Sequence, residues 1–229
     1  MEKERRISIA VGVLYVLGTV FGIVSVVLMN PLQNTDNFLS AIAAHELRYM
    51  GGIFAVFLMG ASLTFIPILL FPLLKKKYEK SALVCLVFRS GLEMANYIIA
   101  VLLFLGLFFF AKNSVPLAID SGLLYLLGDT IKDLTRNPVL IFVFSIYAFT
   151  LYMVLYRSRL IPRWISILGI VAIALHFITT FLELFGIQES FSTANLIMNF
   201  PIFIQEMIMA AYLIIRGFKK EAVLILNKS

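Results

Sequence analysis

Long, uninterrupted apolar runs constrain this chain more than any other feature of its sequence. A helix needs about 20 apolar residues to cross about 30 Å of hydrocarbon. None of the runs alternates between apolar and polar residues, as the strands of a membrane barrel do. Six runs have the required length, and we predict a membrane-spanning helix in each of residues 7–29, 52–74, 82–111, 138–156, 164–185 and 196–215.

The composition leads to the same class of protein. Hydrophobic residues make up 61% of the 229 residues and charged residues 14%, whereas a soluble domain is about half apolar and a quarter charged. This composition excludes a disordered chain, a disulfide scaffold and an ordinary water-soluble enzyme. The single cysteine, Cys85, lies in an apolar run, so we expect a buried hydrophobic side chain there rather than a reactive thiol.

The basic residues predict the orientation of the spans. With a cytoplasmic N-terminus, fourteen of the 19 Lys and Arg residues fall in inner segments, four in outer segments and one, Arg89, inside a span. This distribution follows the positive-inside rule and predicts that both termini are cytoplasmic. The net charge of +6 is then explained by anchoring near anionic lipid. The sequence has no basic face with stacking aromatics, so we expect no nucleic-acid partner.

The remaining segments complete the predicted architecture. The first apolar run is longer than the core of a signal peptide, so we interpret it as a retained helix. Residues 35–50 and 115–134 carry apolar side chains at helical spacing with polar ones between them, which predicts two short amphipathic helices on the outer side. No repeat or change in composition marks a domain boundary. We therefore expect one all-α bundle over residues 1–229, as a monomer or as half of a homodimer.

Several polar side chains lie deep within the predicted spans. Arg89 and Glu93 are four residues apart on one helix and can form an ion pair. At a rise of 1.5 Å per residue, Glu206 and His176 lie roughly 15–20 Å from the inner edge, near the middle of the hydrocarbon layer. Because an ionisable group in hydrocarbon costs a few kcal/mol, such residues are candidates for a functional site. We predict one polar cluster between the third, fifth and sixth spans, made of Arg89, Glu93, His176, Glu206, Tyr97 and Asn199.

Three interpretations of this cluster remain open. It could bind the polar end of a small amphipathic or lipid-like ligand, with or without proton coupling, in a binding or transport protein. It could instead only stabilise helix packing in an accessory or structural subunit. An intramembrane enzyme is the third interpretation, but the sequence has no G-x-S-x-G or HExxH motif and no pair of histidines at ligand spacing. We therefore assign no catalytic residue and expect no metal or cofactor.

The segment before the fifth span has features of a membrane interface. Pro162 is suited to the first turn of a helix, and Trp164 to the boundary between lipid and water. We expect three arginines at this level to contact lipid headgroups, namely Arg157, Arg159 and Arg163.

Motifs spread over nearly the whole chain resemble one family. They are Arg6 with Gly12 and Tyr15, Phe88-Arg89 followed by Glu93, the segment 157–163, and Glu206 followed by residues 212–217. On these residues the chain resembles the bacterial membrane family catalogued as domain of unknown function 4386. The resemblance implies a bacterial cytoplasmic membrane location and no particular reaction. Two positions depart from the family pattern, with Tyr212 in place of an expected Trp and Thr135-Arg136-Asn137 in place of an expected His. An activity that needed this His would be absent.

Overall fold

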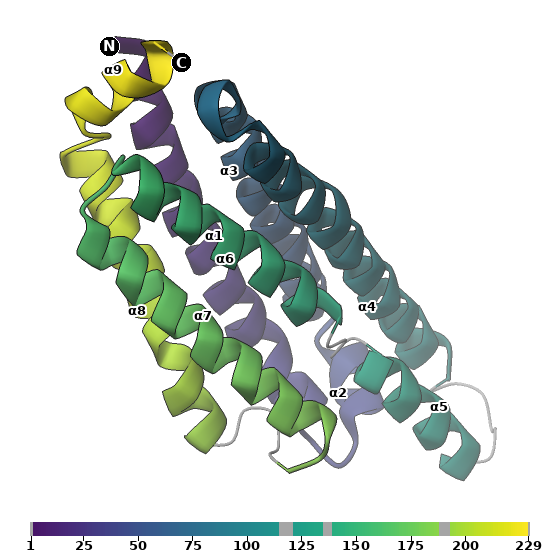
Figure 1. Cartoon of the computed structure of the whole chain (residues 1–229). Helices are drawn as coiled ribbons and strands as arrows, with labels where there is room; N and C mark the ends of the chain where they lie inside the picture. Colours follow the sequence, from purple (N-terminus) through teal and green to yellow (C-terminus); the bar gives the residue numbers. More distant parts are fainter. Residues whose placement is uncertain (1, 115–120, 135–138, 188–192, 229) are drawn as a thin grey trace. The chain divides into compact units, whose positions relative to one another are not determined.

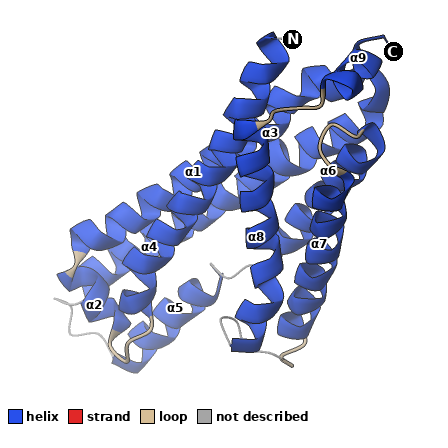
Figure 2. Cartoon of the chain, turned by 90° about the vertical axis from the view of Figure 1, so that its left-hand side faces the viewer, coloured by secondary structure: helices blue, strands red, loops and turns tan. Residues whose placement is uncertain are grey.

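The structure is a computed structural model that describes residues 2–114, 121–134, 139–187 and 193–228. All regular secondary structure in these ranges is helical (Figure 2), which confirms the predicted all-α class. Five of the described helical segments are long and apolar enough to cross a membrane. They expose many large apolar side chains, including Phe54, Leu102 and Ile197 at more than 60%. Exposure on this scale is typical of a surface that contacts lipid rather than water.

The first helix, α1 (Glu2–Gln33), is longer than predicted. The predicted span, residues 7–29, stops before Pro31, whereas the helix continues through this residue. Proline has no N–H, so it leaves the carbonyl of Val27 without its helical donor. Arg48 Nη2 donates to this carbonyl at 3.1 Å, and Nε of the same side chain donates to Leu28 O at 3.0 Å. A side chain from another segment thus replaces the missing hydrogen bond.

The two predicted outer helices are present with shorter bounds. The segment 35–50 contains α2 (Phe38–Ala44), which buries Phe38 and Ile42. The next helix, α3 (Glu46–Cys85), begins two residues after α2 ends. Later in the chain, α5 (Ser121–Leu134) covers most of the second predicted segment, whose residues 115–120 lie outside the described part.

The second and third predicted spans are joined without a loop. Residues 46–114 are helical through α3, η1 (Leu86–Glu93) and α4 (Met94–Ser114), and only Tyr78 has non-helical angles (φ −125°, ψ 43°). In a straight helix, Thr64 and Ser90 would be about 39 Å apart. Instead, Ser90 Oγ donates to Thr64 O at 2.8 Å. The chain therefore reverses direction near Tyr78, and the basic inner loop predicted at residues 75–80 is a tight helical hairpin.

Contacts divide the chain into two compact units. The first comprises residues 1–16, 62–93 and 138–229, and the second comprises residues 17–61 and 94–137. In the first unit, α6 (Val139–Ser158) packs along α7 (Arg163–Leu184), and α7 packs along α8 (Thr193–Ile215) (Figure 1). In this unit η1 lies against α6.

The second unit is held together by polar and aromatic contacts near its short helices. Both α2 and α5 pack against α4. Gln33 Nε2 donates to the hydroxyl of Tyr49 at 2.9 Å, and the ring of Tyr49 stacks on Phe108 with 6.4 Å between centroids. Lys112 and Glu46 form an ion pair at 2.9 Å. These contacts join α1, α3 and α4 within the unit.

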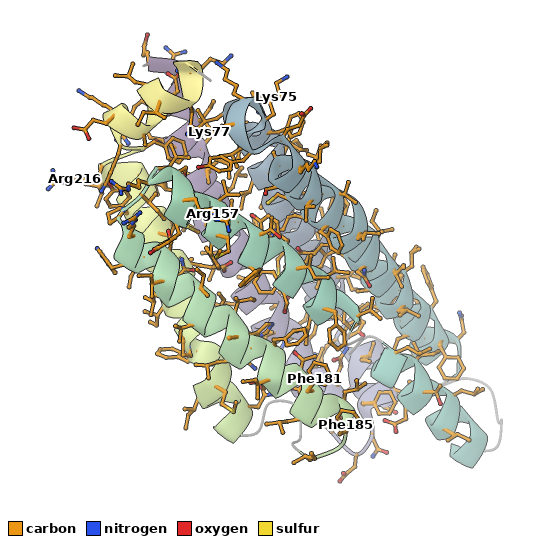
Figure 3. The ribbon with its side chains drawn as sticks, viewed as in Figure 1. Lys75, Lys77, Arg157, Phe181, Phe185 and Arg216 are labelled. Carbon is orange, nitrogen blue, oxygen red and sulfur yellow. The ribbon has the colours of Figure 1, made fainter. Side chains whose placement is uncertain are left out.

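One end of the first unit is basic and the other is aromatic (Figure 3). Lys75, Lys77, Arg157 and Arg216 lie toward one end, and Phe181 and Phe185 lie at the opposite end. The start of α1 lies at the basic end, together with α9 (Lys220–Lys228), a helix beyond the last predicted span. The buried residues of α9 are Ala222, Val223 and Leu226. The sequence did not predict this helix, because its apolar residues are few and lie between charged ones.

Candidate functional site

The predicted site begins on an unusual helical turn. Residues 86–93 form η1, a π-helix that carries both Arg89 and Glu93. Such turns are rare, and they often occur at functional sites because they change the direction in which side chains project. The hydrogen bond from Ser90 to Thr64 fixes this turn against α3. The π-helical turn and this tie together set the direction in which Arg89 projects.

The predicted ion pair between Arg89 and Glu93 is present. Arg89 Nη1 lies 3.2 Å from Glu93 Oε2, and the two side chains are only 1% and 2% exposed. An arginine side chain is not deprotonated in proteins. The site therefore holds a permanent cation almost completely shielded by protein.

Two aromatic rings of α6 cover the guanidinium group. Arg89 Cζ lies 4.6 Å from the ring centre of Tyr147 and 5.2 Å from that of Phe144. A cation over an aromatic ring gains about 2 kcal/mol where water is excluded. The hydroxyl of Tyr147 shares a hydrogen bond with that of Tyr15 at 3.2 Å. Phe144 and Tyr147 form an aromatic cage over Arg89. The sequence did not predict this cage, because two aromatic residues three positions apart are common in a chain with 21 Phe.

The guanidinium group is not fully hydrogen-bonded. Arg89 Nε and Nη1 are buried and have no acceptor with hydrogen-bond geometry among the described residues. The ion pair with Glu93 is close enough for electrostatic attraction, but Nη1 is not aligned for a hydrogen bond. A buried donor without an acceptor costs about 1–3 kcal/mol, and more when it is charged. The site therefore has unused capacity for a hydrogen-bond acceptor.

A second carboxylate lies near the pair without touching it. Glu206, on α8, is within electrostatic range of Arg89 and Glu93. It forms no hydrogen bond or ion pair with another residue of the described ranges. One guanidinium thus faces two carboxyl groups, of which only Glu93 is in direct contact.

His176 belongs to a separate chain of hydrogen bonds. Its Nδ1 donates to Asn199 Oδ1 at 2.6 Å, and Asn199 Nδ2 donates to Asn195 Oδ1 at 3.1 Å. Asn195 Nδ2 in turn donates to Glu183 Oε1. The rings of His176 and Phe144 pack in a T-shaped arrangement with 5.5 Å between centroids. Phe144 therefore contacts both His176 and Arg89, and the structure shows no direct hydrogen bond between these two.

Tyr97 is in the second unit, where its ring packs against Gly60. Arg157 lies toward the basic end of the first unit (Figure 3), and Arg163 covers the ring of Tyr156 at 4.9 Å. Arg159 stands in the turn between α6 and α7 with a φ of 56°.

An apolar groove of about 340 Å³ lies between α6 and α7. Ser145 and Ile146 contribute to its lining, next in sequence to the two rings of the cage, and the rest of the lining is almost entirely hydrophobic. On α6, therefore, residues 144 and 147 face the cation while the residues between them border the groove. As for metals, no three His, Cys, Asp or Glu side chains in the described ranges are placed to hold an ion.

These features together define the class of protein. The apolar helices and the buried Arg–Glu pair are those of an all-α polytopic membrane protein. The chain belongs to the family described as Domain of unknown function (DUF4386), which it matches over residues 10–217. No curated protein and no solved structure matches the chain.

Proposed function

We propose that this membrane protein binds a small amphipathic, lipid-like molecule and places the polar end of that molecule against Arg89. The observation that carries the proposal is the pair of buried Arg89 donors, Nε and Nη1, that lack an acceptor within the described ranges. Buried polar groups in proteins are normally satisfied, and an exception calls for a partner such as a ligand or an ordered water. A ligand that offers a hydroxyl or carboxyl oxygen would supply this acceptor.

An apolar groove beside the ring-bearing turn of α6 suits an amphipathic molecule in particular. The groove between α6 and α7 is lined by apolar side chains and is large enough for part of an alkyl chain. The cluster itself contributes one cation and two carboxyl groups, Glu93 and Glu206. Since Glu206 has no direct counter-charge, we propose that it carries and releases a proton when the ligand binds or moves.

The membrane arrangement is part of the same proposal. The reversal at Tyr78 divides the longest apolar segment into two antiparallel parts, which supports six spans. The basic residues at one end of the first unit support cytoplasmic termini, by the positive-inside rule. We place the protein in a bacterial cytoplasmic membrane, with Arg157, Arg159 and Arg163 at the level of the lipid headgroups, and a homodimer is compatible with this arrangement.

One alternative is favoured by a specific observation. Arg89 and Glu93 lie on the same helix, and their ion pair is enclosed by rings from α6. In this alternative, the role of the enclosed pair is limited to holding η1 against α6, and the protein is an accessory subunit that binds no small molecule.

Binding of three C16 probes to the full chain in phosphatidylcholine nanodiscs separates these functions. Hexadecanol and palmitic acid offer an oxygen acceptor, whereas hexadecyltrimethylammonium offers none. We expect the first two to raise the melting temperature of the wild-type protein, since a ligand at 100 times its Kd stabilises by about 2.7 kcal/mol. The shift should disappear in Arg89→Met.

Thr179→Val is the matched control, because this buried hydroxyl donates to Leu175 O within its own helix. It should keep the full shift with both acceptor probes. If none of the probes stabilises the wild type, or if the shifts are the same in Arg89→Met, the ligand-binding function is wrong and the structural alternative stands.

A further inference from the structure

A second cavity lies at the basic end of the first unit, away from the Arg89 pair. It has a volume of about 90 Å³ and is lined by Glu4, Arg5, Arg216, Phe218, Lys220 and Val223. A cavity of this kind needs about 10–15 Å³ to hold one water, so this one has room for several waters or for one polar group of comparable size. Three of its six lining residues are cationic and one is anionic.

The three cations of this cavity have different roles. Arg5 is a structural residue, because its guanidinium donates to Leu213 O at 3.0 Å and to Ile214 O at 2.6 Å, at the end of α8. Arg216 and Lys220 are exposed, and neither forms an ion pair or side-chain hydrogen bond with the described part of the chain. Their charges are therefore available to a ligand.

The turn that carries Arg216 and Lys220 is fixed by contacts of its backbone. Gly217 has a φ of 75°, and a Cβ atom there would lie 2.9 Å from Arg5 Nη1, so a larger residue would displace the arginine. The next tie is the hydrogen bond from Lys219 N to Leu160 O at 2.9 Å. The backbone of the turn between α8 and α9 is thus fixed, and it keeps Arg216 and Lys220 at the cavity.

The anionic wall of the cavity is also fixed. Asn227 Nδ2 donates to Glu4 Oε1 at 3.4 Å, and Lys76 Nζ donates to Asn227 Oδ1 at 2.8 Å. These bonds connect α1 and α9 with α3 near its reversal at Tyr78. With Glu4 counted, the lining keeps a formal charge of +2, which favours an anionic ligand over a cationic one.

Apolar side chains beside the cavity face outward. Ile215 is 70% exposed, and Leu224 and Ile225 of α9 are 50% and 56% exposed. On α9 these two residues lie opposite a face that is buried, so the short helix has apolar groups on both sides. A helix of this kind at the basic end of a membrane protein lies at the boundary between headgroups and acyl chains.

We infer that this cavity is a binding site for a phosphate group, with Arg216 and Lys220 as the residues that hold it. The outward apolar side chains next to the cavity favour a phosphate that belongs to an anionic phospholipid, whose acyl chains would lie along Ile215 and α9. This site is independent of the function proposed for Arg89. It would tie α1, α8 and α9 to the membrane through one lipid molecule.

Native mass spectrometry of the full-length protein tests the inference. The protein is exchanged into detergent with phosphatidylglycerol, with phosphatidylcholine, or with inorganic phosphate alone. We expect one phosphatidylglycerol to be retained with at least tenfold higher affinity than phosphatidylcholine. The double variant Arg216→Ala/Lys220→Ala should lose this preference. Both side chains are exposed, so the variant is expected to fold.

The matched control removes two other exposed cations at the same end, Lys75 and Lys77 (Figure 3). Lys75→Ala/Lys77→Ala should retain the bound phosphatidylglycerol. If inorganic phosphate binds wild type and competes fully with the lipid, the phosphate site stands and its source is free phosphate. If the cavity variant and the control lose the lipid equally, or neither loses it, the inference is wrong.

Discussion

Replacement of Glu93 by Gln is the most direct test of how the buried pair contributes to stability. The substitution keeps the shape of the side chain and removes the charge that lies 3.2 Å from Arg89 Nη1. The guanidinium stays charged, and its surroundings exclude water almost completely. Glu93→Gln therefore leaves a buried cation without a counter-charge in direct contact.

The size of the effect follows from the geometry. Breaking a buried ion pair from one side costs about 3–5 kcal/mol, and the nearby Glu206 places this case at the lower limit, about 3 kcal/mol. For a chain of this size, each 1 kcal/mol corresponds to about 2–4 °C in melting temperature, so we expect a decrease of about 6–12 °C. Replacing the whole pair with apolar residues of similar volume is neutral or stabilising by about 1–4 kcal/mol. Arg89→Met/Glu93→Leu should therefore melt at or above the wild-type temperature.

The assay is thermal unfolding of the purified protein, followed by size-exclusion chromatography after heating in one detergent. Glu206→Gln is the control, since Glu206 makes no direct contact with Arg89 and its substitution should shift the melting temperature by less than half as much. Wild-type stability of Glu93→Gln would refute the reasoning. So would an apolar double variant that is as unstable as the single variant.

Two other predictions concern the packing of α1. Arg48→Met should destabilise the protein by about 1–2 kcal/mol, because the carbonyl of Val27 loses its donor. In a Pro31→Ala background the cost of Arg48→Met should be smaller, since the helix regains its own N–H donor. Equal costs in the two backgrounds, measured by denaturant unfolding, would contradict this role of Arg48. Gly12→Ala should cost about 1–3 kcal/mol, since a Cβ atom would lie 2.8 Å from Ala210 O. Gly106→Ala, where a Cβ atom meets nothing within 4 Å, should be neutral or slightly stabilising in the same measurement.

The helical segments were predictable because hydropathy over 20 residues is a strong signal that does not depend on tertiary contacts. Their ends were less predictable. Pro31 is a local signal for a helix end, and it was overridden by Arg48, a residue 17 positions later in the sequence. The turn at Tyr78 has no Gly or Pro, and the reversal there is accompanied by a contact between Thr64 and Ser90, which no local pattern reports.

The candidate site was predictable only in part, for a similar reason. The spacing of Arg89 and Glu93 predicts their ion pair on one helix, and depth in the membrane made His176 and Glu206 candidates. The partners of these residues depend on how separate helices are rotated, which depth does not determine. Rotation places the ring of Phe144 beside both Arg89 and His176, and it gives His176 the side chain of Asn199 as its partner.

The treatment of other polar groups in the spans bears on whether Arg89 has only a structural role. Several embedded hydroxyls donate to carbonyls of their own helix, as Ser25 does to Gly22 and Thr180 does to His176. The buried hydroxyls of Ser145 and Ser166 have no hydrogen-bond partner among the described residues. Packing alone would be better served by apolar residues than by a buried ion pair with unfilled donors. Arg89 instead keeps two donors without acceptors beneath two rings. Because an unfilled charged donor costs more than an unfilled hydroxyl, the retention of this cation favours a site whose acceptor comes from outside the protein.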